Sequence, residues 1–155
     1  MSVDEIQAKV ESGVKHTLTE WRAIFYSSQM IGIEKDRMAE YRKALHKRFE
    51  CPSWITKDWL IIPMDLMYPS HLERAFHHCI KNVWDLYRES CAEGMSMTEI
   101  TLLYGRALRS EKSVKLICVA QTRQGYEPTE QDLSKLRGML LTLKNWFPDA
   151  RDEFG

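Results

Sequence analysis

The chain has 155 residues, a length that fits one compact domain with a single hydrophobic core. Its 22 Lys and Arg residues are balanced by 22 Asp and Glu residues, so no overall field draws it to nucleic acid or to a membrane surface. Binding of either kind would need a local patch of charge. A hydrophobic content of 44% argues against a disordered chain.

The cysteines and the apolar stretches bear on the cellular compartment. The four cysteines are far apart and form no C-x-x-C pair, which favours free, mostly buried thiols. The acidic start of the chain, Met1 to Glu5, is unlike a secretory signal, and the longest apolar stretch, Trp59 to Met64, is too short to span a bilayer. We therefore expect a cytoplasmic protein that does not bind membranes. The cysteines are Cys51, Cys79, Cys91 and Cys118.

Three segments carry the pattern of a helix N-terminus. In each, a serine is followed three residues later by a glutamate, so that the serine hydroxyl can accept a hydrogen bond from the glutamate N–H. An amphipathic run follows each pair, which predicts an all-α fold. The pairs are Ser2 and Glu5, Ser70 and Glu73, and Ser96 and Glu99.

The first third of the chain predicts two helical runs. Apolar residues from Val3 to Phe25 fall at steps of three or four, which predicts one helix from residue 3 to about Gln29. Gly32 allows a break, and a second run extends from Met38 to Phe49. The two runs form either one kinked helix or an antiparallel hairpin.

The segment from Cys51 to Pro69 differs from its surroundings, because its three prolines forbid a continuous helix while its apolar residues are too many for a solvated loop. The first interpretation is an extended segment packed across the helical core, with a short strand or a helical turn. The second is a surface that binds a protein partner through tryptophan and methionine side chains. Those residues are Trp54, Trp59, Met64 and Met67.

The second half predicts further helices. A long helix starts near Leu72 and ends at Gly94, a shorter one covers residues 97 to about 108, and the apolar run 114–119 is ambiguous but favoured as helix. Thr129 caps a last helix whose leucines continue to Phe147, and Pro148 ends it. The fold is therefore expected to be an all-α bundle of five to six helices, with one domain over residues 1–148 and a polar tail over 149–155.

No chemical motif stands out. Among His71, His77, His78 and Cys79, adjacent histidines point about 100° apart on a helix, and only Glu73 and His77 have a spacing suited to a shared metal ion. The chain has no nucleophile elbow, no glycine-rich phosphate loop and no paired catalytic carboxylates. We therefore expect no enzymatic activity, no metal and no cofactor.

Two stretches concentrate basic residues. Residues 35–48 hold six, and they form either an ordinary solvated face or a phosphate-contacting patch with Tyr41 placed for stacking. Residues 106–123 overlap the outline of a helix-turn-helix over 97–121 with its turn at Gly105. The nucleic-acid-binding candidates are Arg42, Lys43, Lys47, Arg106, Arg109, Lys112 and Lys115.

The sequence thus predicts a small binding protein, an adaptor, inhibitor or regulatory subunit, that docks a helix face or the tryptophan segment onto a protein partner. The alternative is a nucleic-acid-binding protein that uses the two basic stretches. The leucine stripe of the last helix is compatible both with a sealed core and with a homodimer interface.

Overall fold

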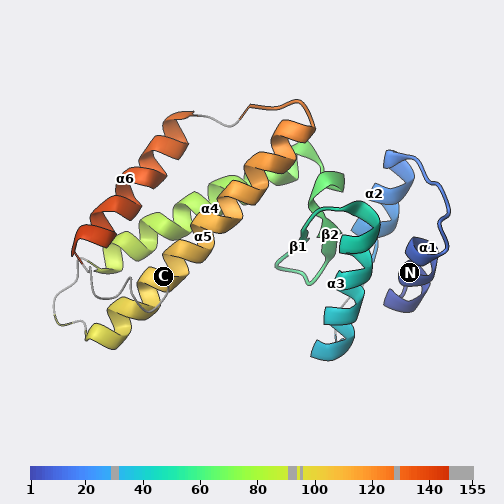
Figure 1. The fold of residues 1–155 in the computed structure, drawn as a ribbon, viewed down its shortest axis with the longest axis horizontal. Coiled ribbons are helices and arrows are strands. Elements are labelled where there is room, and N and C mark those ends of the chain that lie inside the picture. Colours follow the sequence, from blue (N-terminus) through green and yellow to red (C-terminus); the bar gives the residue numbers. More distant parts are fainter. Residues whose placement is uncertain (29–31, 91–93, 95, 128–129, 147–155) are drawn as a thin grey trace. The chain divides into compact units, whose positions relative to one another are not determined.

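The computed structural model describes residues 1–28, 32–90, 94, 96–127 and 130–146 (Figure 1). The chain is 73% helical, with six helices and a small two-stranded sheet over these residues, which confirms the all-α prediction. No helix in this part of the chain is long and apolar enough to cross a bilayer. The chain divides into two compact units, Met1–His71 and Leu72–Gly155. The single domain over residues 1–148 stays a prediction, and the polar tail lies outside the described residues.

Unit 1 is built from short elements. They are, in chain order, helices α1 (Val3–Glu11), α2 (Leu18–Tyr26) and α3 (Lys35–Phe49), strands β1 (Ser53–Ile55) and β2 (Ile61–Pro63), the 3-10 helix η1 (Met64–Leu66) and the first residues of α4.

The helix expected from residue 3 to about Gln29 is wrong, because α1 ends at Glu11 and α2 begins at Leu18. Gly13 has φ +74°, a conformation that glycine adopts without a steric penalty. The Thr17 hydroxyl then caps α2 by accepting a 3.2 Å hydrogen bond from Glu20 N–H. Thr17 and Glu20 are thus a fourth Ser/Thr-x-x-Glu pair, which was not among the predicted helix starts. Ser2 caps α1 as predicted, with a bond of 3.2 Å from Glu5 N–H.

Helices α2 and α3 are separate, so the single kinked helix is excluded. Their ends meet through aromatic rings, because Phe49 at the end of α3 lies 5.2 Å from Trp21 and 5.7 Å from Phe25, measured between ring centroids. Trp21 and Phe25 are themselves stacked at 5.9 Å. Contact between the end of α3 and these residues of α2 fits the antiparallel alternative. The α3 helix buries Tyr41 and Leu45 on its inner side.

The segment from Cys51 to Pro69 forms a β-hairpin followed by η1. Trp54 pairs with Ile62 in the antiparallel register, and Ile61 and Ile62 are fully buried. Arg22 holds the segment from α2, because its Nε donates to the Leu66 carbonyl at 2.8 Å. These contacts confirm the first interpretation, a segment packed into the core with a short strand and a helical turn.

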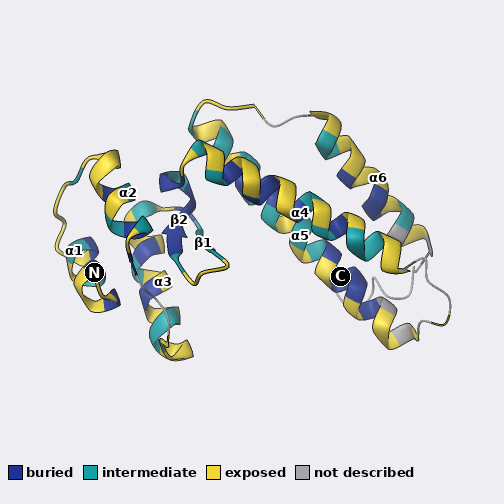
Figure 2. Cartoon of the chain, turned by 180° about the vertical axis from the view of Figure 1, so that it is seen from behind, coloured by how far each residue is buried: buried dark blue, intermediate teal, exposed yellow. Residues whose placement is uncertain are grey.

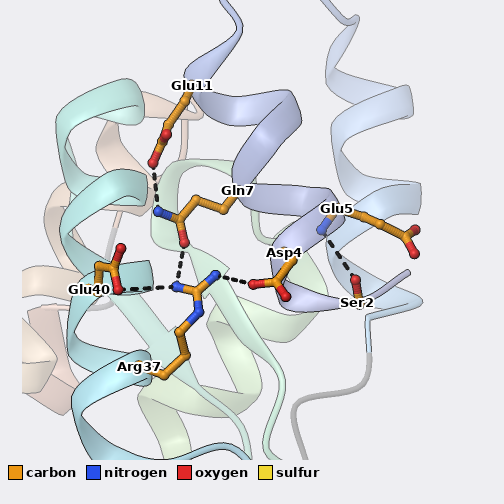
Figure 3. A network of polar contacts seen from close by, with 7 residues as sticks. All are labelled: Ser2, Asp4, Glu5, Gln7, Glu11, Arg37 and Glu40. Carbon is orange, nitrogen blue, oxygen red and sulfur yellow. Dashed lines mark hydrogen bonds and ion pairs between the residues drawn. The ribbon is translucent and has the colours of Figure 1, made fainter.

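A polar network joins α1 to α3 (Figure 3). The guanidinium of Arg37 donates to Asp4 Oδ1 at 2.6 Å and to Gln7 Oε1, and its Nη1 lies 3.8 Å from Glu40 Oε2. Gln7 in turn donates to Glu11 at 2.6 Å. The pKa of Arg37 is raised, chiefly by its hydrogen bond to Asp4. Arg37 therefore links α3 to α1 through these hydrogen bonds.

Unit 2 consists of long helices. Helix α4 (Pro69–Ser90) begins in unit 1 and continues through unit 2, followed by α5 (Met97–Arg123) and α6 (Glu130–Trp146). Buried and exposed residues alternate around each of them (Figure 2). Leu136 and Leu140 of the leucine stripe are buried, and Lys135 of α6 lies over the Trp84 ring of α4.

The start signals in this half are confirmed in part. Ser96 caps α5 through a 3.2 Å bond from Glu99 N–H, as predicted. Ser70, however, lies inside α4, because Pro69 occupies the first helical position, where its missing N–H has no cost. Gly94 has the expected left-handed φ of +83°. The predicted cap at Thr129 and the stop at Pro148 lie outside the described residues.

The helix-turn-helix outline over residues 97–121 is wrong, because α5 runs without interruption through Gly105. Gly105 is buried inside the helix. The ambiguous run 114–119 is helical, as favoured, and it buries Val114 and Ile117.

Candidate functional site

The four side chains expected to bind a protein partner have different environments. Met64 and Met67 are 2% and 0% exposed, so they pack in the core of unit 1 and present no side-chain surface to a partner. Trp54 is partly buried on β1. Trp59 is 54% exposed. Of these four, Trp59 is the one whose side chain is mostly accessible.

Trp59 lies in the loop between β1 and β2, and this loop holds it in an unusual conformation. Its φ is +63°, a left-handed value that bulky residues rarely adopt. Thr56 stabilises the loop, because its carbonyl accepts from Trp59 N–H at 3.0 Å and its hydroxyl accepts from Leu60 N–H at 3.0 Å. Backbone strain of this kind concentrates at functional positions, so the exposed indole is a candidate binding group.

The first basic stretch forms a groove on α3, which we call the basic groove. It has a volume of about 660 Å³ and contains three of the predicted nucleic-acid-binding residues, Arg42, Lys43 and Lys47. Their side chains are exposed. The other lining residues were not predicted as site residues from the sequence. The complete lining is Ala39, Arg42, Lys43, His46, Lys47, Pro52 and Ser53.

The second wall of the basic groove results from the way in which α3 ends. Glu50 takes a left-handed conformation, with φ +55°, and its N–H donates to the His46 carbonyl at 2.9 Å. Pro52 cannot continue the helix, and its carbonyl accepts from Met64 N–H at 2.9 Å. The chain therefore turns back at Glu50 and places Pro52 and Ser53 beside α3.

The three permanent cations of the basic groove have no carboxylate partner among the described residues. In that part of the chain, no Asp or Glu lies within ion-pair distance of Arg42, Lys43 or Lys47. Other arginines of unit 1 are engaged, since Arg37 pairs with Asp4 and Arg48 lies over the rings of Trp21 and Phe49. The groove therefore holds positive charge that the described part of the protein does not neutralise.

His46 has a defined orientation in the groove. Its Nδ1 lies 3.2 Å from the Cys51 carbonyl oxygen, which can only accept, so Nδ1 carries a hydrogen and donates it. The Nε2 atom is then the ring nitrogen left for a ligand. Ser53 is another lining residue of the groove. Its Oγ atom is buried and has no hydrogen-bond partner among the described residues.

Tyr41 is not available for stacking on a base, contrary to the expectation for this stretch. It is 0% exposed and lies on the inner side of α3. Burial raises the pKa of its hydroxyl, although the Arg37 charge lowers it slightly. The hydroxyl therefore stays protonated, and the ring belongs to the core of unit 1.

The second basic stretch has a different geometry. Arg106, Arg109, Lys112 and Lys115 are exposed on α5. They follow at steps of three, so the first and the last lie about 180° apart around the helix. Lys115 is also paired with Glu111 at 3.1 Å. The uninterrupted α5 helix distributes these four side chains around its surface, and none of them lines the basic groove.

Metal and thiol chemistry find little support. Glu73 and His77 lie 3.8 Å apart, but within the described residues no group of three His, Cys, Asp or Glu side chains could hold a metal ion. Burial raises the pKa of the Cys79 thiol to about 11 and raises that of Cys118 as well. Both thiols are therefore protonated at neutral pH and poor nucleophiles.

Comparisons with known proteins add no functional information. The chain matches no protein family, no curated protein sequence and no solved structure. Any function therefore has to follow from the geometry and charge of the site.

Proposed function

We propose that this chain is a small binding protein that holds an acidic segment of a partner protein in the basic groove. The observation that carries the proposal is the set of three cations, Arg42, Lys43 and Lys47, that line the α3 side of one groove without a carboxylate partner among the described residues. Because the whole chain has a net charge of zero, this positive charge is local and suits a short acidic segment better than a long polyanion.

Three observations favour a peptide over nucleic acid as the ligand. Tyr41 is buried, so the groove lacks the aromatic platform on which bases of a single strand would stack. Helix α5 is continuous, so the helix-turn-helix outlined over residues 97–121 does not present a recognition helix to a duplex. The apolar side chains of Ala39 and Pro52 line the groove and offer contacts to the aliphatic parts of a peptide.

Trp59 is a second contact point for the same kind of partner. Tryptophan is among the residues that contribute most to protein interfaces, and this one is exposed in a strained loop.

The thiols Cys79 and Cys118 form no disulfide, which fits a reducing compartment. We therefore place the proposed binding in the cytoplasm.

The first test measures the affinity of an end-labelled decaglutamate peptide by fluorescence anisotropy at low and at moderate salt. The double variant Lys43→Glu/Lys47→Glu should bind about tenfold more weakly, because two exposed charge contacts of about 1 kcal/mol or less each become repulsive. The matched control is Arg109→Glu/Lys112→Glu on α5, which changes the net charge by the same amount. It should bind within about twofold of the unmodified protein, since its side chains are exposed on α5 and do not line the basic groove.

Circular dichroism of all three proteins shows whether each variant is folded. Equal loss of affinity in both double variants would overturn the proposal, because only the net charge would then matter. The absence of any binding to decaglutamate would overturn it too. Tighter binding of a labelled twelve-residue thymidine strand than of decaglutamate would move the basic groove to the nucleic-acid alternative.

A further inference from the structure

Resting on the proposed function, we infer that the basic groove recognises a phosphorylated serine side chain within the acidic segment. Four lining residues of α3 carry or can carry positive charge: Arg42, Lys43, His46 and Lys47. Arg42 and His46 are four residues apart, and so are Lys43 and Lys47, so the four lie within an arc of about 140° and a rise of about 8 Å. This density of donors suits one compact dianion.

Charge matching distinguishes phosphate from carboxylate at this site. A phosphoserine carries a charge of about −1.5 to −2 at pH 7 and three strongly accepting oxygens, whereas a carboxylate carries one charge and two oxygens. The planar guanidinium of Arg42 can donate two parallel hydrogen bonds to phosphate oxygens, and the lysines act as point charges. A single carboxylate would leave most of the positive charge in the groove unbalanced.

His46 contributes a directed donor. Its Nδ1 is already used by the Cys51 carbonyl at 3.2 Å, so only Nε2 can contact a ligand, and Nε2 donates when the ring is protonated. The Nε2 atom therefore offers one directed donor beside the charges of Arg42, Lys43 and Lys47, which line the same groove.

Ser53 supplies an independent observation on the other wall. Its hydroxyl is buried without a hydrogen-bond partner among the described residues, an arrangement that costs stability. Ser53 is one of the residues that line the groove. The Oγ atom is closed off from the groove in this structure, so a phosphate oxygen becomes its acceptor only when the Ser53 side chain rotates toward the groove, and phosphate has more acceptors to share than a carboxylate.

The test uses three labelled nonapeptides with the sequence Gly-Glu-Gly-Glu-X-Glu-Gly-Glu-Gly, where X is phosphoserine, aspartate or serine. Anisotropy titrations at pH 7 compare their affinities for the full chain. The phosphoserine peptide should bind about tenfold more tightly than the aspartate peptide, because it gains charge and acceptors at one position. The serine peptide should bind more weakly than both.

Two variants identify the residues that select phosphate. Arg42→Lys keeps the charge but loses the fork of donors. His46→Asn keeps an N–H that can reach the Cys51 carbonyl but removes Nε2. Each should reduce the preference for phosphoserine over aspartate from about tenfold to about threefold, whereas the control Arg109→Lys on α5 should leave that preference unchanged. A variant with a merely structural fault would weaken all peptides alike.

The outcomes separate this inference from the proposed function. Equal binding of the phosphoserine and aspartate peptides, with decaglutamate still bound, would overturn the inference and leave the acidic-segment proposal in place. A failure of every acidic peptide to bind would overturn both. Displacement of the phosphoserine peptide by lower concentrations of a twelve-residue thymidine strand than of the unlabelled peptide would show that the groove prefers a nucleic acid backbone.

Discussion

Two helices of this chain have similar numbers of basic residues but use them differently. On α3, the cations at positions 42, 43 and 47 gather beside a turn of the chain and line a groove without carboxylate partners among the described residues. On α5, the cations at positions 106, 109, 112 and 115 wind around an uninterrupted helix, and the last is paired with Glu111. The difference shows that a site depends on the spacing of its residues and on the path of the chain after the helix, and composition alone does not create one.

The largest expected effects concern the buried sides of these same two helices. Leu45 of α3 and Ile117 of α5 are both fully buried, so Leu45→Ala and Ile117→Ala should each lower the free energy of unfolding by about 3 kcal/mol. If residues 1–148 form one cooperative domain, both substitutions lower the midpoint of the same single calorimetric transition. Separate transitions, each sensitive to only one of the substitutions, would contradict the single domain.

How far the sequence predicts the fold depends on how glycines and caps combine. Gly13 ends α1 because a capping pair at Thr17 and Glu20 restarts the helix shortly after it. Gly105 interrupts nothing, because no capping pair comes after it and the residues on both sides continue one apolar stripe. Hydrophobic periodicity missed the break at Gly13, whereas at Gly105 it predicted a continuous helix, and the error there came from the helix-turn-helix outline.

The site was predictable in part for a similar reason. Arg42, Lys43 and Lys47 are visible as a basic cluster, and the spacing of Arg42 and His46 by four residues could have added His46. The wall formed by Pro52 and Ser53 could not be read from the sequence, since it depends on a left-handed Glu50. Non-glycine residues seldom adopt that conformation, so no local rule predicts it.

Backbone strain is a second property that separates the units. Among the described residues, the two non-glycine residues with positive φ, Glu50 and Trp59, both lie in unit 1. Trp59→Gly and Trp59→Ala remove the same indole, but only glycine adopts φ +63° without strain. The glycine variant should therefore be more stable than the alanine variant by about 1 kcal/mol in chemical denaturation.

The reverse order of stability would show that Trp59 is not held in a strained conformation in solution. Both variants should also bind a protein partner of the basic groove more weakly, if Trp59 is a contact point. Unchanged capture of a partner by both folded variants would limit docking to the groove. Trp54 contrasts with Trp59, because its indole is partly buried on β1. Trp54→Ala should therefore lower the free energy of unfolding more than it weakens binding.

The smallest expected effects compare the exposed sides of α3 and α5. Lys43 and Lys47 are like charges four residues apart, so Lys43→Glu replaces a repulsion by an attraction in the favourable order. Lys115→Glu does the opposite, because it replaces the ion pair with Glu111 by a repulsion. We expect a gain of a few tenths of a kcal/mol (~0.3) for the first variant and a similar loss for the second.

Urea denaturation of both variants alongside the unmodified protein can resolve this difference in sign. The proximity of Glu40, three residues before Lys43, reduces the gain on α3 but does not reverse it, since the new pair with Lys47 is the closer match to the preferred spacing. A more stable Lys43→Glu variant that no longer binds acidic peptides would show that α3 keeps its repelling cations at the expense of stability, as a binding surface does. A loss of stability in both variants would instead make the cations of α3 part of the structural surface, as they are on α5.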